Sequence, residues 1–249
     1  IINGGTTDVG ADQYLLQAKY DRFDKFDPDL VVLGLYLNDS RPPQGFLGEN
    51  QDEIFNFLKH PFLKHLALIH YFKQGYVAFQ SRRGKGYSQR LNWLPRYRSG
   101  RWRNDMGEFR RTVKEARYDW GAAWDSSFVR IVHPALTEIK NLYAKKAVRL
   151  ALVLFPVSLQ VYTNLKGPFI DKPQQDLKEY VSEANIPMMD LLPSLREVKD
   201  LKPFADQAHL NRRGNRIVAD LLYPFIKELI VKHPVGGDEK LNFHEASPG

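Results

Sequence analysis

The stretch that decides the fold of this chain is Asp29-Leu30-Val31-Val32-Leu33-Gly34-Leu35-Tyr36. It is short, almost continuously apolar, and introduced by the turn residues Asp27-Pro28. A parallel strand that is covered on both faces has this composition, because neither of its faces meets water. We therefore expect a buried parallel strand here.

Similar patterns recur further along the chain. A second apolar run at 148–157 follows a helix-like segment at about 135–145, and a weaker strand at 186–191 follows a helical stretch at 176–184. The last element begins near Asn211 and carries apolar pairs every four residues, which is the stripe of a helix that faces a core. Strands that alternate with helices predict an α/β fold with a mostly parallel sheet.

The 249 residues suffice for one α/β domain, which we place at 1–235, followed by a flexible tail at 236–249. Between the strand that ends before Asp39 and the run that starts at Val148, the chain is far longer than an ordinary connection. We therefore expect a large insertion at about 41–130. Its part at 52–70 looks helical, whereas 81–124 mixes basic and aromatic residues without clear periodicity.

Positive charge is concentrated in one part of this insertion. Between Arg82 and Arg117 there are twelve Lys or Arg and three acidic residues, a balance of +9 in a chain whose net charge is +7. This basic-aromatic segment has three possible roles: a solvated loop, a lid that binds an acidic or sugar substrate, or a surface for nucleic acid or anionic membranes. We favour the substrate lid over nucleic acid, because the insertion leaves the sheet where functional loops collect. Its candidate substrate-binding residues are Trp93, Arg96, Arg98, Arg101, Trp102 and Arg103.

Composition excludes several classes of chemistry. The chain has no cysteine, which rules out disulfides, thiolate catalysis and Cys-based metal sites. Its histidines show no metal-binding spacing, and its longest apolar run is too short to span a bilayer. The chain opens on Ile1-Ile2-Asn3 without an initiator Met, in what looks like a strand, so we expect further residues to precede it. The compartment stays open; we favour an extracytoplasmic protein, or one anchored to a membrane through preceding residues.

The residues that carry chemistry lie at the two ends of the chain. In Asp206-Gln207-Ala208-His209, a carboxylate stands three residues before a histidine on an expected turn, where it can orient the imidazole as a general base. Gly5 and Asn38-Asp39 each follow an expected strand. In parallel sheets, functional residues collect where the strands end. We therefore expect these three segments to converge at the carboxyl end of the sheet, with Asp39 on the substrate side.

These motifs occur in the order Asn3-Gly4-Gly5, then Asn38-Asp39, then Asp206-x-x-His209-Leu210-Asn211-x-x-Gly214. In this order they resemble the SGNH (GDSL-type) hydrolase superfamily, over roughly 1–40 and 146–230. The resemblance implies a three-layer α/β/α, flavodoxin-like fold without metal or organic cofactor. It also implies that His209 is the base, that Asp206 orients it, and that Gly5 and Asn38 form the oxyanion hole.

The chain departs from that family in one respect. The family's nucleophile is the serine of a Gly-Asp-Ser block, and no Gly-Asp-Ser occurs here. We expect the nucleophile to precede Ile1; an inactive relative of the family is the alternative. The expected function is that of a serine-dependent ester hydrolase or deacylase that acts through an acyl-enzyme on an ester or acylated glycan. A glycan O-acetyltransferase and a non-catalytic glycan- or anion-binding module remain alternatives, and the oligomeric state stays open.

Overall fold

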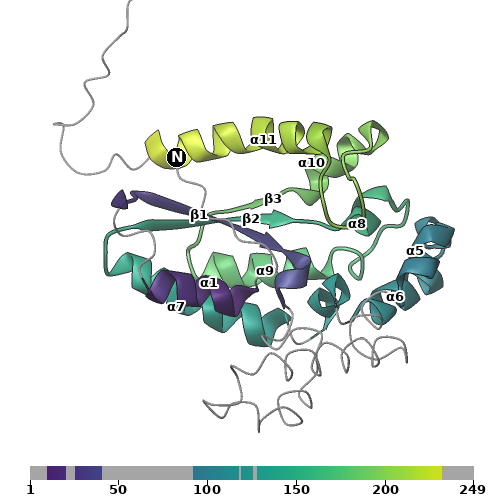
Figure 1. Cartoon of the computed structure of the whole chain (residues 1–249), viewed down its shortest axis with the longest axis horizontal. Helices are drawn as coiled ribbons and strands as arrows, with labels where there is room; N and C mark the ends of the chain where they lie inside the picture. The colour runs from purple at the N-terminus through teal and green to yellow at the C-terminus, as the bar shows by residue number, and fades with distance from the viewer. Residues whose placement is uncertain (1–9, 21–25, 41–91, 118, 126–127, 232–249) are drawn as a thin grey trace, which may run out of the picture.

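The computed structural model describes residues 10–20, 26–40, 92–117, 119–125 and 128–231. Gly5, the helix expected at 52–70, the basic residues at 82–90 and the expected tail at 236–249 lie outside these ranges. Within them the protein is a mixed α/β structure built on a parallel sheet (Figure 1). None of the described helices combines the length and apolar character needed to cross a membrane.

The described strands are β1 (Leu30–Tyr36), β2 (Arg149–Phe155) and β3 (Met188–Asp190), which run parallel in the order β1-β2-β3. The strands expected from the apolar runs are therefore present. β1 and β2 are paired along their whole length, from Leu30 opposite Arg149 to Tyr36 opposite Phe155, so they end level with each other. β2 ends at Phe155, before the expected end at Val157. The residue after Phe155 is Pro156, which has no N–H to donate to a neighbouring strand.

Helices connect and cover these strands. In the described ranges the α-helices are α1 (Ala11–Lys19), α5 (Leu94–Ser99), α6 (Met106–Glu115), α7 (His133–Ala144), α8 (Ser158–Tyr162), α9 (Lys172–Glu183), α10 (Leu192–Glu197) and α11 (Arg212–Val231). Short 3-10 helices are η2 (Leu37–Ser40), η5 (Arg101–Arg103), η6 (Trp120–Trp124) and η8 (Lys199–Leu201), and η7 (Phe128–Val132) is a π-helix. α9 begins four residues before the expected start, with Pro173 in its first turn, where a missing N–H costs no hydrogen bond.

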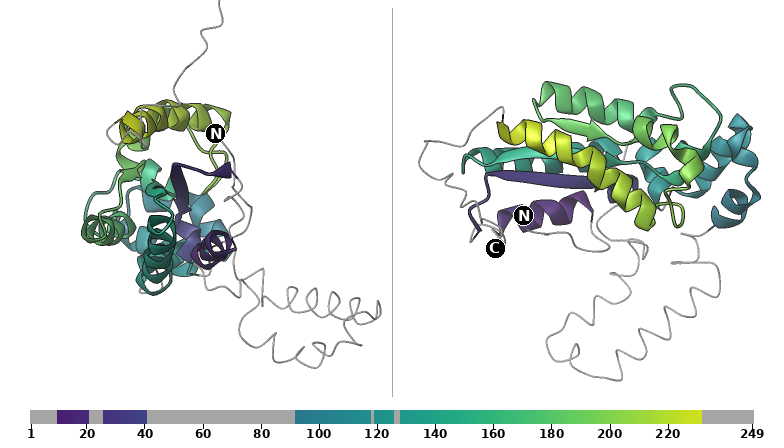
Figure 2. Two further views of the ribbon diagram at one scale, coloured as in Figure 1. Left: turned by 90° about the vertical axis from the view of Figure 1, so that its left-hand side faces the viewer. Right: turned by 90° about the horizontal axis from the view of Figure 1, so that it is seen from above.

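Alternate residues of β2 enter two different cores. Leu150, Leu152 and Leu154 pack with residues of α1, α7 and α9, whereas Val153 and Phe155 pack with residues of α10 and α11. Figures 1 and 2 show α11 on one side of the sheet and α1, α7 and α9 on the other. Burial on both sides explains why the strands are apolar at nearly every position.

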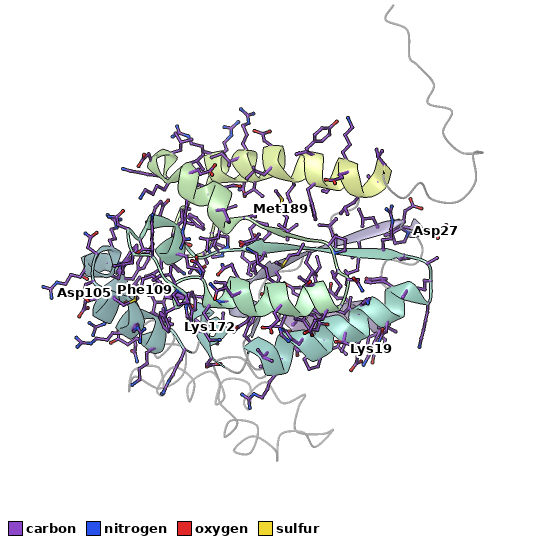
Figure 3. All side chains as sticks on the ribbon, turned by 180° about the vertical axis from the view of Figure 1, so that it is seen from behind. Lys19, Asp27, Asp105, Phe109, Lys172 and Met189 are labelled. Carbon is purple, nitrogen blue, oxygen red and sulfur yellow. The ribbon has the colours of Figure 1, made fainter. Side chains whose placement is uncertain are left out.

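The described part of the basic-aromatic segment, 92–117, is more ordered than its sequence pattern indicates. It forms α5, η5 and α6, which bury Trp93, Trp102 and Phe109 in the same core as the α7 side of the sheet. α5 and α6 lie beyond the carboxyl ends of the strands, beside α8 (Figures 1 and 2). In Figure 3, Phe109 of α6 and Asp105, which caps the start of that helix, lie at the opposite end of the molecule from Asp27, which precedes β1. The segment therefore adjoins the end of the sheet where the candidate site lies.

Candidate active site

Asp206 and His209 lie in direct contact on the turn before α11. His209 Nδ1 is 2.8 Å from Asp206 Oδ2 and 3.0 Å from Oδ1. Asp206 Oδ1 also accepts the backbone N–H groups of Ala208 at 2.9 Å and His209 at 2.8 Å. The expected contact is present, and we refer to residues 206–209 as the dyad turn. With 76% of the His209 side chain exposed, the imidazole is open to an incoming molecule.

The surroundings of Asp206 keep its carboxylate charged. Partial burial acts to raise its pKa, but the backbone N–H groups of His209 and Ala208, followed by the His209 ring, outweigh this and lower the pKa below its usual value. The pKa of Asp206 is lower in the folded protein than in the unfolded chain. The charged carboxylate therefore stabilises the turn fully at pH values above the ordinary aspartate pKa. That contribution is lost as the pH falls through the lowered value. At neutral pH the imidazole therefore faces a full negative charge.

The dyad turn is fixed on its α11 side by backbone contacts. Phe204 and Leu210 form an antiparallel bridge across its base, and the Ala205 N–H donates to the His209 carbonyl at 2.8 Å. Asn211 caps α11 by accepting the Gly214 N–H at 2.9 Å. Gly214 is buried so close to Pro203 that a Cβ would lie 2.1 Å from the Pro203 carbonyl oxygen. Only a residue without a side chain fits here, so Gly214 sets the distance between the turn and the helix.

A second set of contacts ties the dyad turn to α8. The Ser158 N–H donates to the Gln207 carbonyl at 2.8 Å, and the Phe204 N–H donates to the Tyr162 hydroxyl at 3.2 Å. Ser158 is the third residue after the end of β2. The turn is therefore held at the carboxyl end of the sheet.

Asn38 lies at the same end, in η2 directly after β1. Because β1 and β2 end level, Asn38 and the start of α8 both lie just past the carboxyl ends of neighbouring strands. Asn38 is half-buried, and its amide makes no hydrogen bond to another described residue. Among the described residues, this amide is therefore an unused N–H donor at the end of the sheet that holds the dyad turn.

Asp39 was expected on the substrate side, and that expectation is wrong. Asp39 is only 3% exposed, and its carboxylate accepts the Tyr36 N–H at 2.8 Å and the Tyr14 hydroxyl at 2.9 Å. The Tyr36 bond closes the turn after β1, and the Tyr14 bond joins that turn to α1. Asp39 fixes the backbone that carries Asn38 and is not available to a ligand.

Two of the expected substrate-binding residues are internal to the fold, and a third, which is partly exposed, is held in ion pairs. Trp93 and Trp102 are 0% and 1% exposed, so neither offers a stacking face. Arg96 is paired with Glu115 at 2.8 Å and with Glu108 at 2.6 Å, and these bonds raise its pKa. Its charge is thus neutralised between α5 and α6. Arg98, Arg101 and Arg103 are exposed, as expected.

The structure also brings residues to the site that sequence reasoning missed. Tyr97 Oη lies 2.6 Å from Ser158 Oγ, which is completely buried. Ser158 therefore contacts Tyr97 and not the His209 ring, so it is no candidate nucleophile. Ser158 directly follows the second apolar run, and this position could have indicated from the sequence that it lies near the candidate site. Nothing in the sequence around Tyr97 pointed to that partner.

No three His, Asp or Glu side chains come together as possible metal ligands in the part of the chain that the structure describes. Comparison with known proteins finds no matching family model, no matching curated protein and no matching solved structure. The functional argument therefore depends on the geometry of the site and on the motifs of the sequence.

Proposed function

We propose that this chain belongs to an ester hydrolase or deacylase in which His209 is the general base and Asp206 orients it. The observation that carries the proposal is the 2.8 Å contact between the exposed His209 ring and an ionised carboxylate, on a turn held at the carboxyl end of a parallel sheet. A contact this exposed adds little to stability. A histidine held this way at the end of a parallel sheet is suited to proton transfer.

The proposed reaction assigns one role to each group. The His209 ring takes the proton of a serine hydroxyl, whose oxygen attacks the ester carbonyl and forms a tetrahedral intermediate. Asn38, together with the Gly5 N–H, donates hydrogen bonds to the oxyanion. The imidazolium, stabilised by Asp206, returns its proton to the leaving alcohol, and water then releases the acyl group by the same steps. We assign the nucleophile to a Gly-Asp-Ser segment that precedes Ile1, because this chain contains no Gly-Asp-Ser.

The same proposal includes the finer architecture, a three-layer α/β/α sandwich of SGNH type with an insertion at about 41–130. It is supported by the entry of alternate β2 residues into two cores and by the position of 92–117 beyond the strand ends. A glycan O-acetyltransferase would use the same groups, with a sugar hydroxyl in place of water in the second step. Product analysis with and without an acceptor sugar separates the two reactions.

The pH dependence of ester hydrolysis tests the proposal. For the full-length protein acting on p-nitrophenyl acetate, we expect kcat/KM to rise with pH, because a general base acts in its unprotonated form. Asp206 adds no ionisation to this profile above about pH 4, because its pKa is lowered below the ordinary value. No turnover above the buffer rate, or a rate that falls as the pH is raised from about 5 to about 8, contradicts general-base catalysis by His209.

The exposed arginines favour a second candidate function, the binding of an anionic ligand. Arg101 and Arg103 flank the buried Trp102 on η5, and the Arg103 carbonyl accepts hydrogen bonds from the Asn164 N–H at 2.9 Å and the Thr163 hydroxyl at 3.2 Å. The backbone that presents them is therefore fixed. Burial raises the pKa of the Tyr97 and Tyr162 hydroxyls, and the nearby positive charge of Arg103 opposes this rise in part. An anionic group of a substrate would find positive charge beside the dyad turn.

Replacement of both arginines tests this role. We expect Arg101→Gln/Arg103→Gln to raise KM for an acidic ester about fivefold at low salt, and less at high salt, because exposed charges are screened. KM for a neutral ester stays unchanged. Lys145→Gln/Lys227→Gln removes the same charge from two exposed positions, one just after the end of α7 and one on α11, and is the control. Equal effects of the two variants contradict a local site, and loss of single-stranded nucleic acid binding without a kinetic effect indicates a nucleic-acid surface instead.

A further inference from the structure

Tyr97 joins helix α5 to the dyad turn through two hydrogen bonds. Its hydroxyl lies 2.6 Å from Ser158 Oγ, and the Ser158 N–H donates to the Gln207 carbonyl at 2.8 Å. Gln207 lies inside the turn, between Asp206 and His209. A residue of the basic-aromatic segment is thus connected to the backbone that carries the candidate base.

The ring of Tyr97 is held on several sides. It stacks on Trp102 with ring centroids 5.5 Å apart and meets Trp93 edge-on at 5.6 Å. The Trp102 indole N–H donates to the Tyr97 carbonyl at 2.7 Å, which fixes the backbone as well. Because both tryptophans are buried, the ring cannot shift without disturbing the core. The hydroxyl is therefore presented to Ser158 from a rigid frame.

The bond between the two hydroxyl groups is costly to break. Ser158 is 0% exposed, so its hydroxyl loses water on folding and needs a protein partner. Burial raises the pKa of Tyr97, and the bond to Ser158 opposes this only in part, so the phenol stays protonated at neutral pH. Tyr97 can then donate to Ser158 or accept from it.

We propose that Tyr97 is a positioning residue, which acts through Ser158 to hold Gln207, and with it the Asp206–His209 pair, in place at the carboxyl end of β2. The catalytic consequence rests on the proposed function, whereas the effect on the turn does not. Displacement of a base by about 1 Å costs up to about 100-fold in rate. The basic-aromatic segment thereby acquires a role in the chemistry besides any role in substrate binding.

Removal of the phenolic hydroxyl tests the proposal. In the full-length protein, we expect Tyr97→Phe to lower kcat for p-nitrophenyl acetate about fivefold to tenfold, the size of one lost hydrogen bond, with little change in KM. The Ala208 and His209 amides, which donate to Asp206, should exchange with solvent about fivefold faster by NMR. Ser158→Ala has the same effects, and the double variant adds little, because both residues act through one bond.

Tyr180→Phe is the matched control. It removes a tyrosine hydroxyl contact of nearly the same length, though a more exposed one, Tyr180 Oη with Thr137 Oγ1 at 2.7 Å between α9 and α7, and we expect it to leave exchange in the dyad turn unchanged. If the Ala208 and His209 amides of Tyr97→Phe exchange at the wild-type rate, the proposal is overturned, whatever happens to kcat. It is also overturned if Tyr180→Phe accelerates exchange at these amides as much as Tyr97→Phe does. Faster exchange in Tyr97→Phe alone supports it, even where the wild-type protein has no esterase activity. Faster exchange in Tyr97→Phe together with an inactive wild-type protein contradicts the proposed hydrolase function but supports the positioning role of Tyr97.

Discussion

Replacing His209 with alanine is expected to lower kcat of the full-length protein for p-nitrophenyl acetate by about 10⁴-fold to 10⁶-fold, the loss seen when a triad loses its base. Without the imidazole, the proposed reaction lacks the group that takes the serine proton. Asp206→Asn should cost about 10⁴-fold, because the amide neither fixes the correct ring tautomer nor stabilises the imidazolium. Steady-state kinetics on purified proteins measures both effects.

A change within the same turn supplies the control for these variants. Gln207→Ala leaves the backbone bond to Ser158 in place and removes a side chain with no hydrogen bond to another described residue. We expect its kcat to stay within about threefold of the wild type, since substitutions away from special contacts change free energies by about 0.5 kcal/mol. A His209→Ala protein that folds and retains more than a tenth of the wild-type kcat is inconsistent with His209 as the base.

The second large effect is expected from Gly214→Ala. A Cβ at this position would lie 2.1 Å from the Pro203 carbonyl oxygen and 2.9 Å from the Pro203 carbonyl carbon, both of them backbone atoms that cannot rotate away. The segment around Pro203, which precedes the dyad turn, must therefore move away from α11. We expect this shift to lower the free energy of unfolding by about 3 kcal/mol. For a protein of this size we expect the melting temperature to fall by about 10 °C. Ester hydrolysis should fall with it, because the turn is displaced.

Gly107→Ala is the matched control for that variant. Gly107 lies in the first turn of α6, and a Cβ there would meet the Asp105 carboxylate oxygen at 3.1 Å, which is part of an exposed side chain. Alanine favours the helical conformation, whereas the Asp105 oxygen that it would meet caps α6 by accepting the Glu108 N–H at 3.0 Å, so we expect the free energy of unfolding to change by less than about 1 kcal/mol. A Gly214→Ala protein as stable as Gly107→Ala contradicts the packing described for the start of α11.

The parts of the fold that could be predicted from sequence are those with a regular pattern. β1 and β2 are apolar at nearly every position because they are covered on both faces, and the stripe of α11 recurs every four residues because one side faces the sheet. β3 shows a weaker signal, since only Met188–Asp190 pair with β2. The segment at 92–117 has no such regularity, because its short helices are held by individual tryptophans.

Within the site, prediction succeeded where the contact is local in sequence. Asp206 and His209 are three residues apart, so a tight turn alone brings them together. Trp102 and Arg96 were misjudged as ligand-binding residues because tertiary contacts decide whether an aromatic or basic side chain is free. Tyr97 and Ser158, 61 residues apart, meet only after the sheet has formed, so no local pattern predicts their contact.

The most direct test of the central claim is covalent labelling of the full-length protein with a fluorophosphonate, followed by mass spectrometry. Such a reagent reacts with a serine whose proton is removed by a neighbouring base. We predict one adduct per chain, on a serine that precedes Ile1, and labelling slowed at least about 100-fold in His209→Ala, in keeping with the large losses of triad variants. An absence of adduct, or equal labelling rates with and without His209, would contradict the claim that Asp206 and His209 activate a serine nucleophile.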